Sequence, residues 1–203
     1  MNKTWLTADW HCGESRLDLM SRPYKTQNEM IDDFVYKHNI LVKPEDNVIV
    51  VGDAVYQKTP EYLPHIRRFN GIKTLIRGNH DRVFTDEQLQ PYFNRIIKEG
   101  DGIELDIEGI PCFITHYPSQ GRVDKFNIVG HIHAAWKYQL NMINVGVDVH
   151  HFRPIDMATI PFYVNAISKF YDNDVWAAYM PSNEAYKGKR GMAGQYFKPT
   201  DNI

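Results

Sequence analysis

Side chains that can bind metal ions occur at five places along this sequence, each just after an apolar run. Asp9 and His11 form one pair, and His131 and His133 form another, with a single residue between the members of each pair. The full set of candidate ligands is Asp9, His11, Asp53, Asn79, His116, His131 and His133. These are too many for one tetrahedral zinc ion, but they suit two ions that share one carboxylate. The set therefore predicts a centre with two metal ions.

The mixture of ligand types indicates which metals and which reaction such a centre would serve. Imidazole combined with carboxylate and amide oxygen favours Mn²⁺, with Fe, Zn, Ni or Co as alternatives, over Mg²⁺, which prefers oxygen and water. Two ions about 3.5–4 Å apart can hold a hydroxide and bind the oxygens of a phosphate group. A histidine outside the ligand set could then protonate the departing oxygen as a general acid. This chemistry is typical of phosphoester hydrolysis.

The apolar runs before these residues are predicted to be strands. They are short, rich in valine and isoleucine, and bounded by turn residues, as buried strands of layered α/β proteins are. The runs span residues 3–8, 47–51, 72–77, 111–115, 126–129 and 142–147. In open α/β sheets, ligands bind beyond the carboxyl ends of the strands, so we expect the candidate ligands to converge there.

Helices are predicted between the early strands. Residues 28–41 place apolar side chains at steps of three and four, and residues 60–69 and 85–93 are shorter helical segments. Thr85 and Gln88 form a candidate capping box at the start of the last segment. Later, residues 103–107 and 111–115 are predicted to form a hairpin that turns through Glu108 and Gly109. This order predicts an α/β fold in which two sheets pack face to face with helices outside.

The composition excludes several classes of protein. With 203 residues, of which 43% are hydrophobic and 24% are charged, the chain is in the range of globular rather than disordered proteins. Its formal net charge of -2 does not favour a protein that coats nucleic acid non-specifically. There is no apolar stretch of the roughly 20 residues that span a membrane, and no room for a signal peptide before Asp9. Because Cys12 and Cys112 are the only cysteines, we expect a cytoplasmic protein without a disulfide framework. We expect no membrane partner, and the sequence does not indicate the oligomeric state.

Taken together and in this order, the motifs resemble those of the calcineurin-like metallophosphoesterase superfamily. They are Asp9-x-His11, Gly52-Asp53, Gly78-Asn79-His80-Asp81, His116 and Gly130-His131-x-His133. Two stretches, at residues 21–46 and 144–149, further resemble a subgroup of small single-domain phosphoesterases from bacteria and their phages. The resemblance implies a four-layer α-β-β-α sandwich of two mixed sheets, and hydrolysis of a phosphomonoester or phosphodiester with two divalent metal ions.

The resemblance also implies a role for each motif residue. One metal ion would be bound by Asp9, His11, Asp53 and His133. The other would be bound by Asp53, Asn79, His116 and His131. His80 would contact the substrate phosphate and donate the leaving-group proton, and Asp81 would orient His80 through a hydrogen bond.

Several residues near the motifs leave alternatives open. Arg22, Arg77 and Arg82 are candidates for binding a second phosphate or a nucleotide, because guanidinium can donate two parallel hydrogen bonds to phosphate; surface ion pairs are the alternative. Cys12 is either a small core residue or an oxidisable neighbour of the site. His38 is either a helix-surface or a core residue, and His150 and His151 could lie at the rim of the cleft. Tyr56 and Tyr117 are either core residues or side chains on which a base could stack.

The expected substrate is a small phosphorylated molecule of nucleotide type. A nuclease acting on short nucleic acid, and a catalytically idle scaffold that binds proteins, are the alternatives. The phosphoesterase domain is expected over residues 1–167, followed by a C-terminal extension over residues 168–203 that packs on the core or is partly mobile. Trp176 and Tyr179 favour at least partial packing of that extension.

Overall fold

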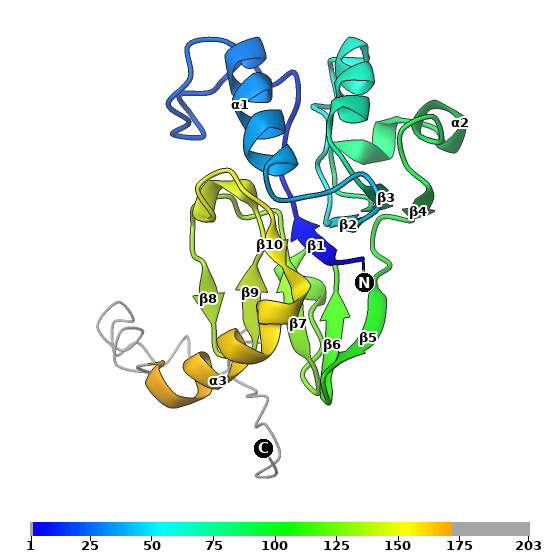
Figure 1. Ribbon diagram of the computed structural model, residues 1–203. Helices are drawn as coiled ribbons and strands as arrows, with labels where there is room; N and C mark the ends of the chain where they lie inside the picture. The colour runs from blue at the N-terminus through cyan, green and yellow to red at the C-terminus, as the bar shows by residue number, and fades with distance from the viewer. Residues whose placement is uncertain (1, 172–203) are drawn as a thin grey trace, which may run out of the picture.

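The computed structural model describes residues 2–171, whose strands form two five-stranded sheets (Figure 1). In spatial order, the first sheet consists of β10 (Ile155–Asp156), β1 (Thr4–Thr7), β2 (Asn47–Val50), β3 (Ile72–Ile76) and β4 (Arg95–Ile97). The second consists of β5 (Ile103–Ile107), β6 (Ile110–Ile114), β7 (Phe126–Val129), β9 (Met142–Asn144) and β8 (Tyr138–Gln139). Both sheets are mixed, because each has a parallel centre and at least one antiparallel edge strand.

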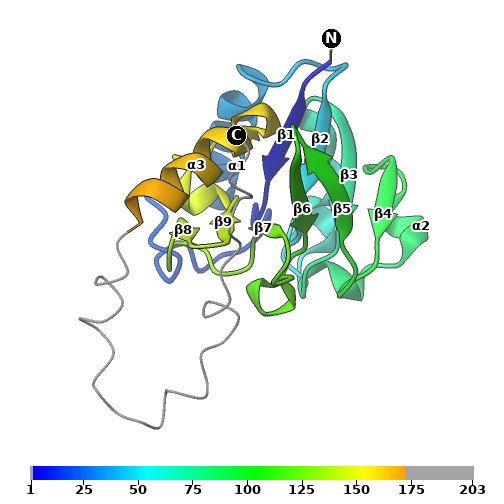
Figure 2. The same cartoon turned by 90° about the horizontal axis from the view of Figure 1, so that it is seen from below.

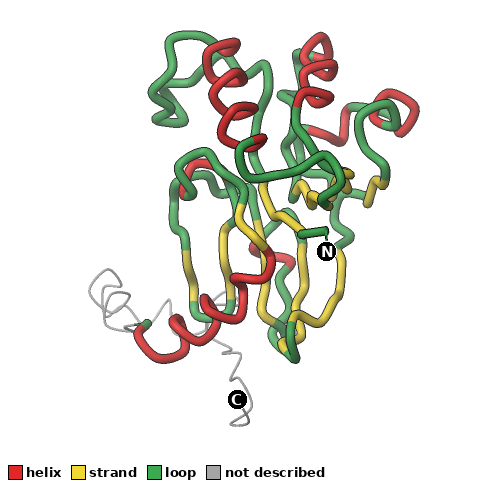
Figure 3. The backbone as a smooth tube through the Cα atoms, viewed as in Figure 1, coloured by secondary structure: helices red, strands yellow, loops and turns green. Residues whose placement is uncertain are grey.

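Three helices lie on the outer face of the first sheet. These are α1 (Gln27–Asn39), the 3₁₀ helix η1 (Pro60–Arg68) and α2 (Asp86–Leu89), which Figures 1 and 3 show above the sheet. Helix α3 (Ile160–Phe170) lies at the opposite end of the molecule, beside β8 and β9, as Figure 2 also shows. Single 3₁₀ turns occupy η2 (Asp81–Val83), η3 (Pro118–Gln120), η4 (Val147–Val149) and η5 (Met157–Thr159). The predicted α/β fold of two mixed sheets with helices is confirmed.

The predicted helices agree with the structure except in one respect. The side chain of Thr26 caps α1 by accepting a hydrogen bond from Glu29 N, and the predicted capping box of Thr85 and Gln88 is present at α2. The segment at 60–69 is a 3₁₀ helix, and Pro64 inside it disfavours an α-helix because proline has no N–H and its ring clashes with the preceding turn. The hairpin of β5 and β6 turns through Glu108 and Gly109, both with positive φ, as expected.

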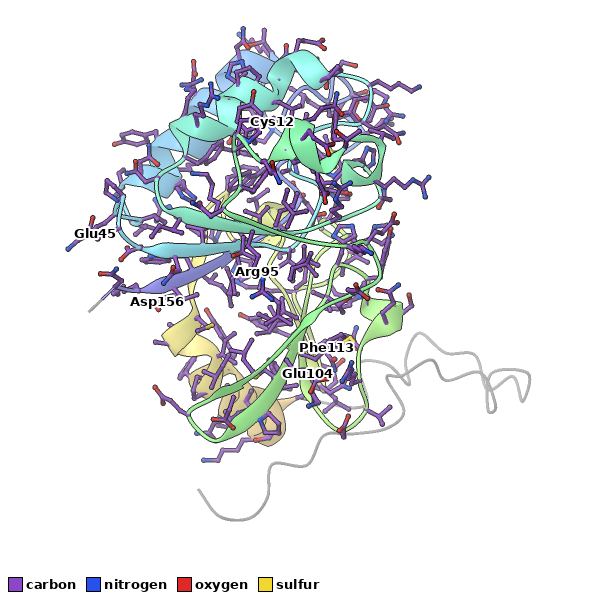
Figure 4. The ribbon with its side chains drawn as sticks, turned by 90° about the vertical axis from the view of Figure 1, so that its right-hand side faces the viewer. Cys12, Glu45, Arg95, Glu104, Phe113 and Asp156 are labelled. Atoms are coloured by element: carbon purple, nitrogen blue, oxygen red, sulfur yellow. The ribbon has the colours of Figure 1, made fainter. Side chains whose placement is uncertain are left out.

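Two apolar clusters hold the layers together. One lies between the first sheet and the helices above it and contains Trp10, Phe34 and Phe69. Figure 4 shows Cys12 on this side of the molecule, and its side chain is part of the cluster. The second cluster lies between the two sheets and includes Leu6 and Ile128, with α3 packing against it through side chains such as Val164. Figure 4 also shows Glu104 and Phe113 on the second sheet, at the end of the view opposite Cys12.

The described part of the chain ends soon after α3. This helix runs through residue 167, where the domain was expected to end, and continues to Phe170. Within residues 2–171, no helix combines the length and the apolar character needed to cross a membrane. The expected C-terminal extension, with Trp176 and Tyr179, lies outside the described residues from residue 172 onward.

Candidate metal centre

The candidate ligands come together where five strands end. Asp9 lies two residues after β1, Asp53 three after β2, Asn79 three after β3, His116 two after β6, and His131 two after β7. The two sheets meet at this point, because Ala8 after β1 forms a parallel bridge with Gly146 after β9. The carboxyl ends of strands from both sheets therefore open onto one site, as the strand order predicts.

Most candidate ligand atoms form two groups that meet at Asp53, and a third group, His11, Asp53 and His80, overlaps both. Asp9, His11 and His133 offer ligand atoms within 4.8 Å of one another, and so do Asp53, His116 and His131. Oδ2 of Asp53 lies 3.4 Å from Nε2 of His11 in the first group and 3.5 Å from Nε2 of His116 in the second. Asn79 joins the second group, because its Oδ1 lies 3.4 Å from Nε2 of His116. A carboxylate at this position can serve two cations at once.

The ring of His11 tests whether these residues fit a metal. His11 is only 2% exposed, and neither of its ring nitrogens makes a hydrogen bond. A buried polar atom without a partner costs free energy, about 1–3 kcal/mol, unless something else binds it. A divalent cation between His11, Asp9 and His133 would provide that partner, so the residues fit the group.

Two other candidate ligands are held in the tautomer that metal binding needs. Nδ1 of His116 donates a hydrogen bond to the carbonyl oxygen of Val51 over 2.8 Å, so Nε2 faces Asp53. Nδ1 of His133 donates to Oδ2 of Asp148, also over 2.8 Å. When the other ring nitrogen is bound in this way, the orientation of a metal-ligating imidazole is fixed.

Most of the candidate ligands have a strained backbone. Five of the seven have a positive φ: Asp9 (60°), His11 (49°), Asp53 (55°), His131 (76°) and His133 (48°). Left-handed backbone in residues other than glycine costs about 1–3 kcal/mol each and is concentrated at functional sites. The hydrogen bonds from His131 N to both carboxylate oxygens of Asp9 are among the contacts that hold this conformation.

Neighbouring glycines make room for the ligands. A Cβ atom on Gly78 would lie 2.2 Å from Oδ1 of Asp53, and one on Gly52 would lie 2.1 Å from Nδ1 of His116. Any side chain at these positions would displace a candidate ligand. The glycines in the Gly52-Asp53 and Gly78-Asn79 motifs therefore have a steric role at the site.

The charges at the centre are strongly coupled. Burial raises the pKa of the Asp9 carboxyl to about 6. Burial acts in the same direction on Asp53, but the hydrogen bond and charge of His116 outweigh it and hold the pKa of Asp53 well below its usual value. Burial lowers the pKa of His116, but Asp53 reverses this and raises it to about 9. His116 thus keeps a proton beside Asp53, and a cation bound there would displace that proton.

Asp81 has different contacts from those expected. Its carboxylate accepts hydrogen bonds from the backbone N–H groups of Asp53 (2.6 Å), Ala54 (3.1 Å) and Gly78 (2.9 Å), and none from the ring of His80. The expectation that Asp81 orients His80 is therefore corrected. Asp81 is fully buried and joins the loop after β2 to the loop after β3.

His80 lies against the first ligand group. Its ring centroid is 4.6 Å from that of His11 and 5.1 Å from that of Tyr56. Its backbone N donates a hydrogen bond to Oδ1 of Asp53, and its Nδ1 is buried without a partner. Burial is the main cause of its lowered pKa, and the charges of Asp53 and Glu14 act against that shift.

Two of the three candidate substrate-binding arginines are structural. The side chain of Arg22 is 0% exposed and binds Asp148 as well as the carbonyl oxygens of Asp9 and Trp10. Arg77 donates to the carbonyl oxygens of Asp81 and Phe84 and pairs with Asp86. Both guanidinium groups are occupied, which corrects the expectation that they bind substrate.

Arg82 is placed differently from the other two. Its side chain is 61% exposed and lies 4.0 Å from Glu99, the carboxylate that also accepts a hydrogen bond from Tyr117. The ring of Tyr117 contacts those of His116 and His131. Arg82 and Tyr117 thus lie on the side of the second ligand group.

The structure decides most of the cases that the sequence left open. His38 is buried between Trp10 and Phe69. His150 is buried and donates a hydrogen bond to Asn144 O, so it is not at an open rim, whereas His151 is exposed. Burial raises the pKa of the Cys12 thiol to about 12, which favours the interpretation as a core residue.

Sequence reasoning assigned no role to four residues that the structure places beside the candidate ligands. Asp148 binds both Arg22 and His133, and Asn144 donates to the carbonyl oxygen of His133. The signal for Asp148 was present, because it follows an apolar run as the candidate ligands do. Glu14 and Arg16, beyond His11, form a further pair close to Tyr56 that no motif indicated.

The comparisons with known proteins agree with this geometry. A family model described as calcineurin-like phosphoesterase matches residues 3–166. A solved structure of a protein of unknown function from Aquifex aeolicus is similar with a TM-score of 0.63 and 21% sequence identity, over 80% of this chain and 100% of that one. At this identity the similarity extends to the fold alone. No curated protein sequence matches the chain.

Proposed function

This chain belongs to the calcineurin-like phosphoesterase family of metal-dependent hydrolases, and we propose that it cleaves a small phosphomonoester or phosphodiester at a centre of two divalent ions. The observation that carries this proposal is the position of Asp53. One of its oxygens lies between the two groups of candidate ligands, 3.4 Å from His11 and 3.5 Å from His116. A single ion would leave one of these groups without a function.

The proposed assignment of ligands follows the two groups. Asp9, His11, Asp53 and His133 would hold one ion, and Asp53, Asn79, His116 and His131 would hold the other. The mixture of imidazole with carboxylate and amide oxygen favours Mn²⁺, with Fe, Zn, Ni or Co as alternatives. When bound, such ions neutralise phosphate charge and lower the pKa of a water molecule toward neutrality.

His80 is proposed as the general acid. Hydrolysis forms a bond from the oxygen of water to phosphorus and breaks the bond to the leaving oxygen, which must gain a proton. The ring of His80 lies against that of His11 but is outside the proposed ligand set, so its proton can go to the leaving oxygen. Burial lowers the pKa of His80, and the charges of Asp53 and Glu14 oppose that shift without reversing it. Asp81 acts indirectly, by holding the loop of Asp53 against the loop of His80.

The proposed substrate is a small molecule of nucleotide type. Arg82 is the one arginine among the three candidates with an exposed side chain, and it lies near Tyr117 beside the second ligand group. A guanidinium and an aromatic ring together suit a phosphate and a base. The protein is proposed to act in the cytoplasm on free molecules, without a membrane partner.

Hydrolysis of bis(4-nitrophenyl) phosphate and 4-nitrophenyl phosphate, with Mn²⁺ and after chelation, tests the proposal. We expect metal-dependent turnover of at least one ester. Asp53→Ala should lose both metal and turnover, whereas His80→Ala should keep its metal and lose most turnover on esters with poor leaving groups. Full activity of His80→Ala on such an ester would refute the acid assignment. Absence of any metal-dependent turnover, together with tight capture of a protein partner, would support a scaffold instead.

A further inference from the structure

The chain continues past the candidate ligand His11 into a loop that is fixed beside the site. Cys12 pairs with Val55 in a parallel bridge, which extends the pairing of β1 and β2 beyond their ends. Glu14 N donates to the carbonyl oxygen of His11, and Gly13 packs so closely on Thr59 that an added Cβ would lie 2.2 Å from its Oγ1. The side chains that follow are therefore held at a defined place.

Arg16 is bound by a buried carboxylate in this loop. Nε and Nη2 of Arg16 donate to the two carboxylate oxygens of Glu14 over 3.0 and 2.8 Å, which is a bidentate pair. The side chain of Glu14 is 4% exposed, whereas that of Arg16 is 56% exposed. The carboxylate that fixes Arg16 is thus buried, whereas the guanidinium is exposed at the surface.

The exposed guanidinium contacts Tyr56, whose ring lies beside that of the proposed general acid. Nη2 of Arg16 also donates to the hydroxyl of Tyr56 over 3.2 Å, and the guanidinium carbon lies 5.5 Å from the centroid of that ring. The ring of Tyr56 also lies beside that of His80, with ring centroids 5.1 Å apart. The order in space is therefore His80, Tyr56, Arg16.

The outer edge of the guanidinium has donors to spare. Arginine has five N–H donors, and the contacts with Glu14 and Tyr56 use those on Nε and Nη2. Within the part of the chain that the structure describes, Nη1 has no hydrogen-bond partner. Because Glu14 already fixes the side chain, little conformational entropy remains to be lost when Nη1 binds a ligand.

We propose that Arg16 binds an oxyanion carried by the leaving group of the substrate. The inference rests on the proposed function, because His80 as general acid puts the leaving oxygen beside its ring. As seen from His80, Arg16 lies beyond Tyr56. The part of the substrate that reaches Arg16 is therefore the rest of the leaving group. Its substrates are accordingly phosphoesters whose leaving group bears a carboxylate or a second phosphate, and Arg16 selects for them.

The opposing interpretation is that Arg16 only braces Tyr56 against His80. A brace would affect every ester equally, whatever its leaving group. A binding role affects esters with an anionic leaving group more than the others, and mainly through KM. The bidentate geometry also makes the role specific to arginine, because the single ammonium of a lysine cannot make two parallel hydrogen bonds to Glu14 and also present a free nitrogen to a ligand.

Three aryl esters with a shared skeleton separate the interpretations. They are phenyl phosphate, 3-carboxyphenyl phosphate and 1,3-phenylene bisphosphate, used as monoesters or as their methyl diesters, whichever class the wild type hydrolyses. With Mn²⁺ bound, we expect Arg16→Ala to reduce kcat/KM for the two esters with an anionic leaving group about 10- to 100-fold more than for phenyl phosphate, whose leaving group has no further charge. Arg16→Lys should resemble Arg16→Ala. The relative loss for carboxylate and for phosphate shows which oxyanion Arg16 prefers.

Arg68→Ala is the matched control. Arg68 also pairs with a carboxylate, Asp32, over 2.6 Å and is 41% exposed, but it is on the outside of the helical layer. It should leave all three rate constants unchanged. An equal loss on all esters in Arg16→Ala would overturn the proposal in favour of the brace, and no loss on any ester would overturn it as well. Failure of the proposed function is distinct, because the wild type would then hydrolyse none of the esters.

Discussion

The imidazole of His133 donates a hydrogen bond from Nδ1 to the carboxylate of Asp148, with 2.8 Å between the atoms. The same carboxylate is bound by Nε and Nη2 of Arg22, at 2.7 and 2.9 Å. Arg22 in turn donates to the carbonyl oxygens of Asp9 and Trp10, which belong to the two peptide groups that precede His11. Three candidate ligands of the first group are thus connected through one buried ion pair.

The first prediction concerns Asp148→Asn. The amide of asparagine accepts a weaker hydrogen bond from His133 and cannot neutralise Arg22, so the ring of His133 loses its fixed orientation. We expect the affinity for Mn²⁺ to fall about 10- to 100-fold, which calorimetric titration measures. Asp32→Asn, at an exposed ion pair, is the control and should keep the wild-type affinity. Equal affinities in the two variants would contradict the role of Asp148.

The second prediction concerns Asp81→Asn. Three backbone N–H groups converge on this carboxylate, and an amide must turn one NH₂ group toward them. We expect a loss of about 1–3 kcal/mol in the free energy of unfolding. Thermal unfolding should show a decrease in Tm of about 2–4 °C for each kcal/mol. An unchanged Tm with a reduced kcat would instead support an orienting role toward His80.

The third prediction compares two glycines. A Cβ at Gly78 would meet Oδ1 of Asp53 at 2.2 Å, whereas one at Gly109 would meet nothing within 4 Å. Gly78→Ala should therefore abolish metal binding. Gly109→Ala should keep it and lose only about 1 kcal/mol of stability from its positive φ. Metal content per chain after dialysis measures the difference, and a fully loaded Gly78→Ala protein would contradict the steric argument.

The fourth prediction concerns stability at low pH. Burial lowers the pKa of His38 to about 4, so between pH 6.5 and 4 the unfolded chain binds a proton at this residue that the folded chain does not. The unfolded chain is therefore stabilised by this proton as the pH falls. The free energy of unfolding is highest above pH 6.5, decreases between pH 6.5 and 4, and reaches its lower value at about pH 4. His38→Gln can still donate to Asn70 O but has no such proton. We expect its free energy of unfolding to depend less on pH in this range by about 1.4 kcal/mol per pH unit; identical slopes would contradict the prediction.

The sequence predicted that the candidate ligands converge because position along a strand carries the information. Each candidate follows an apolar run, and parallel strands end at the same edge, so no knowledge of tertiary contacts was needed. The contacts of Arg22 could not be predicted in the same way, because Asp148 lies 126 residues away. Asp81 shows a second limit: its neighbours in sequence suggested a contact with His80, but backbone groups 27 and 28 residues earlier took two of its hydrogen bonds.

The fold was predictable where elements are long and regular. Helix α1 begins and ends within two residues of its expected bounds, and the hairpin of β5 and β6 turns where expected. Strands β8 and β10 have two residues each, too few to show a pattern. Pro64 was a readable signal against an α-helix at 60–69, since it lacks the N–H that such a helix needs.

The number and coupling of bound Mn²⁺ ions test the central claim most directly. Elemental analysis of the dialysed protein gives the number per chain, and electron paramagnetic resonance shows whether two ions interact through a shared ligand. The account predicts two ions with a coupled spectrum in the wild type, and loss of the coupling in Asp53→Ala. One ion per chain, or two ions with independent spectra, would contradict a centre shared through Asp53.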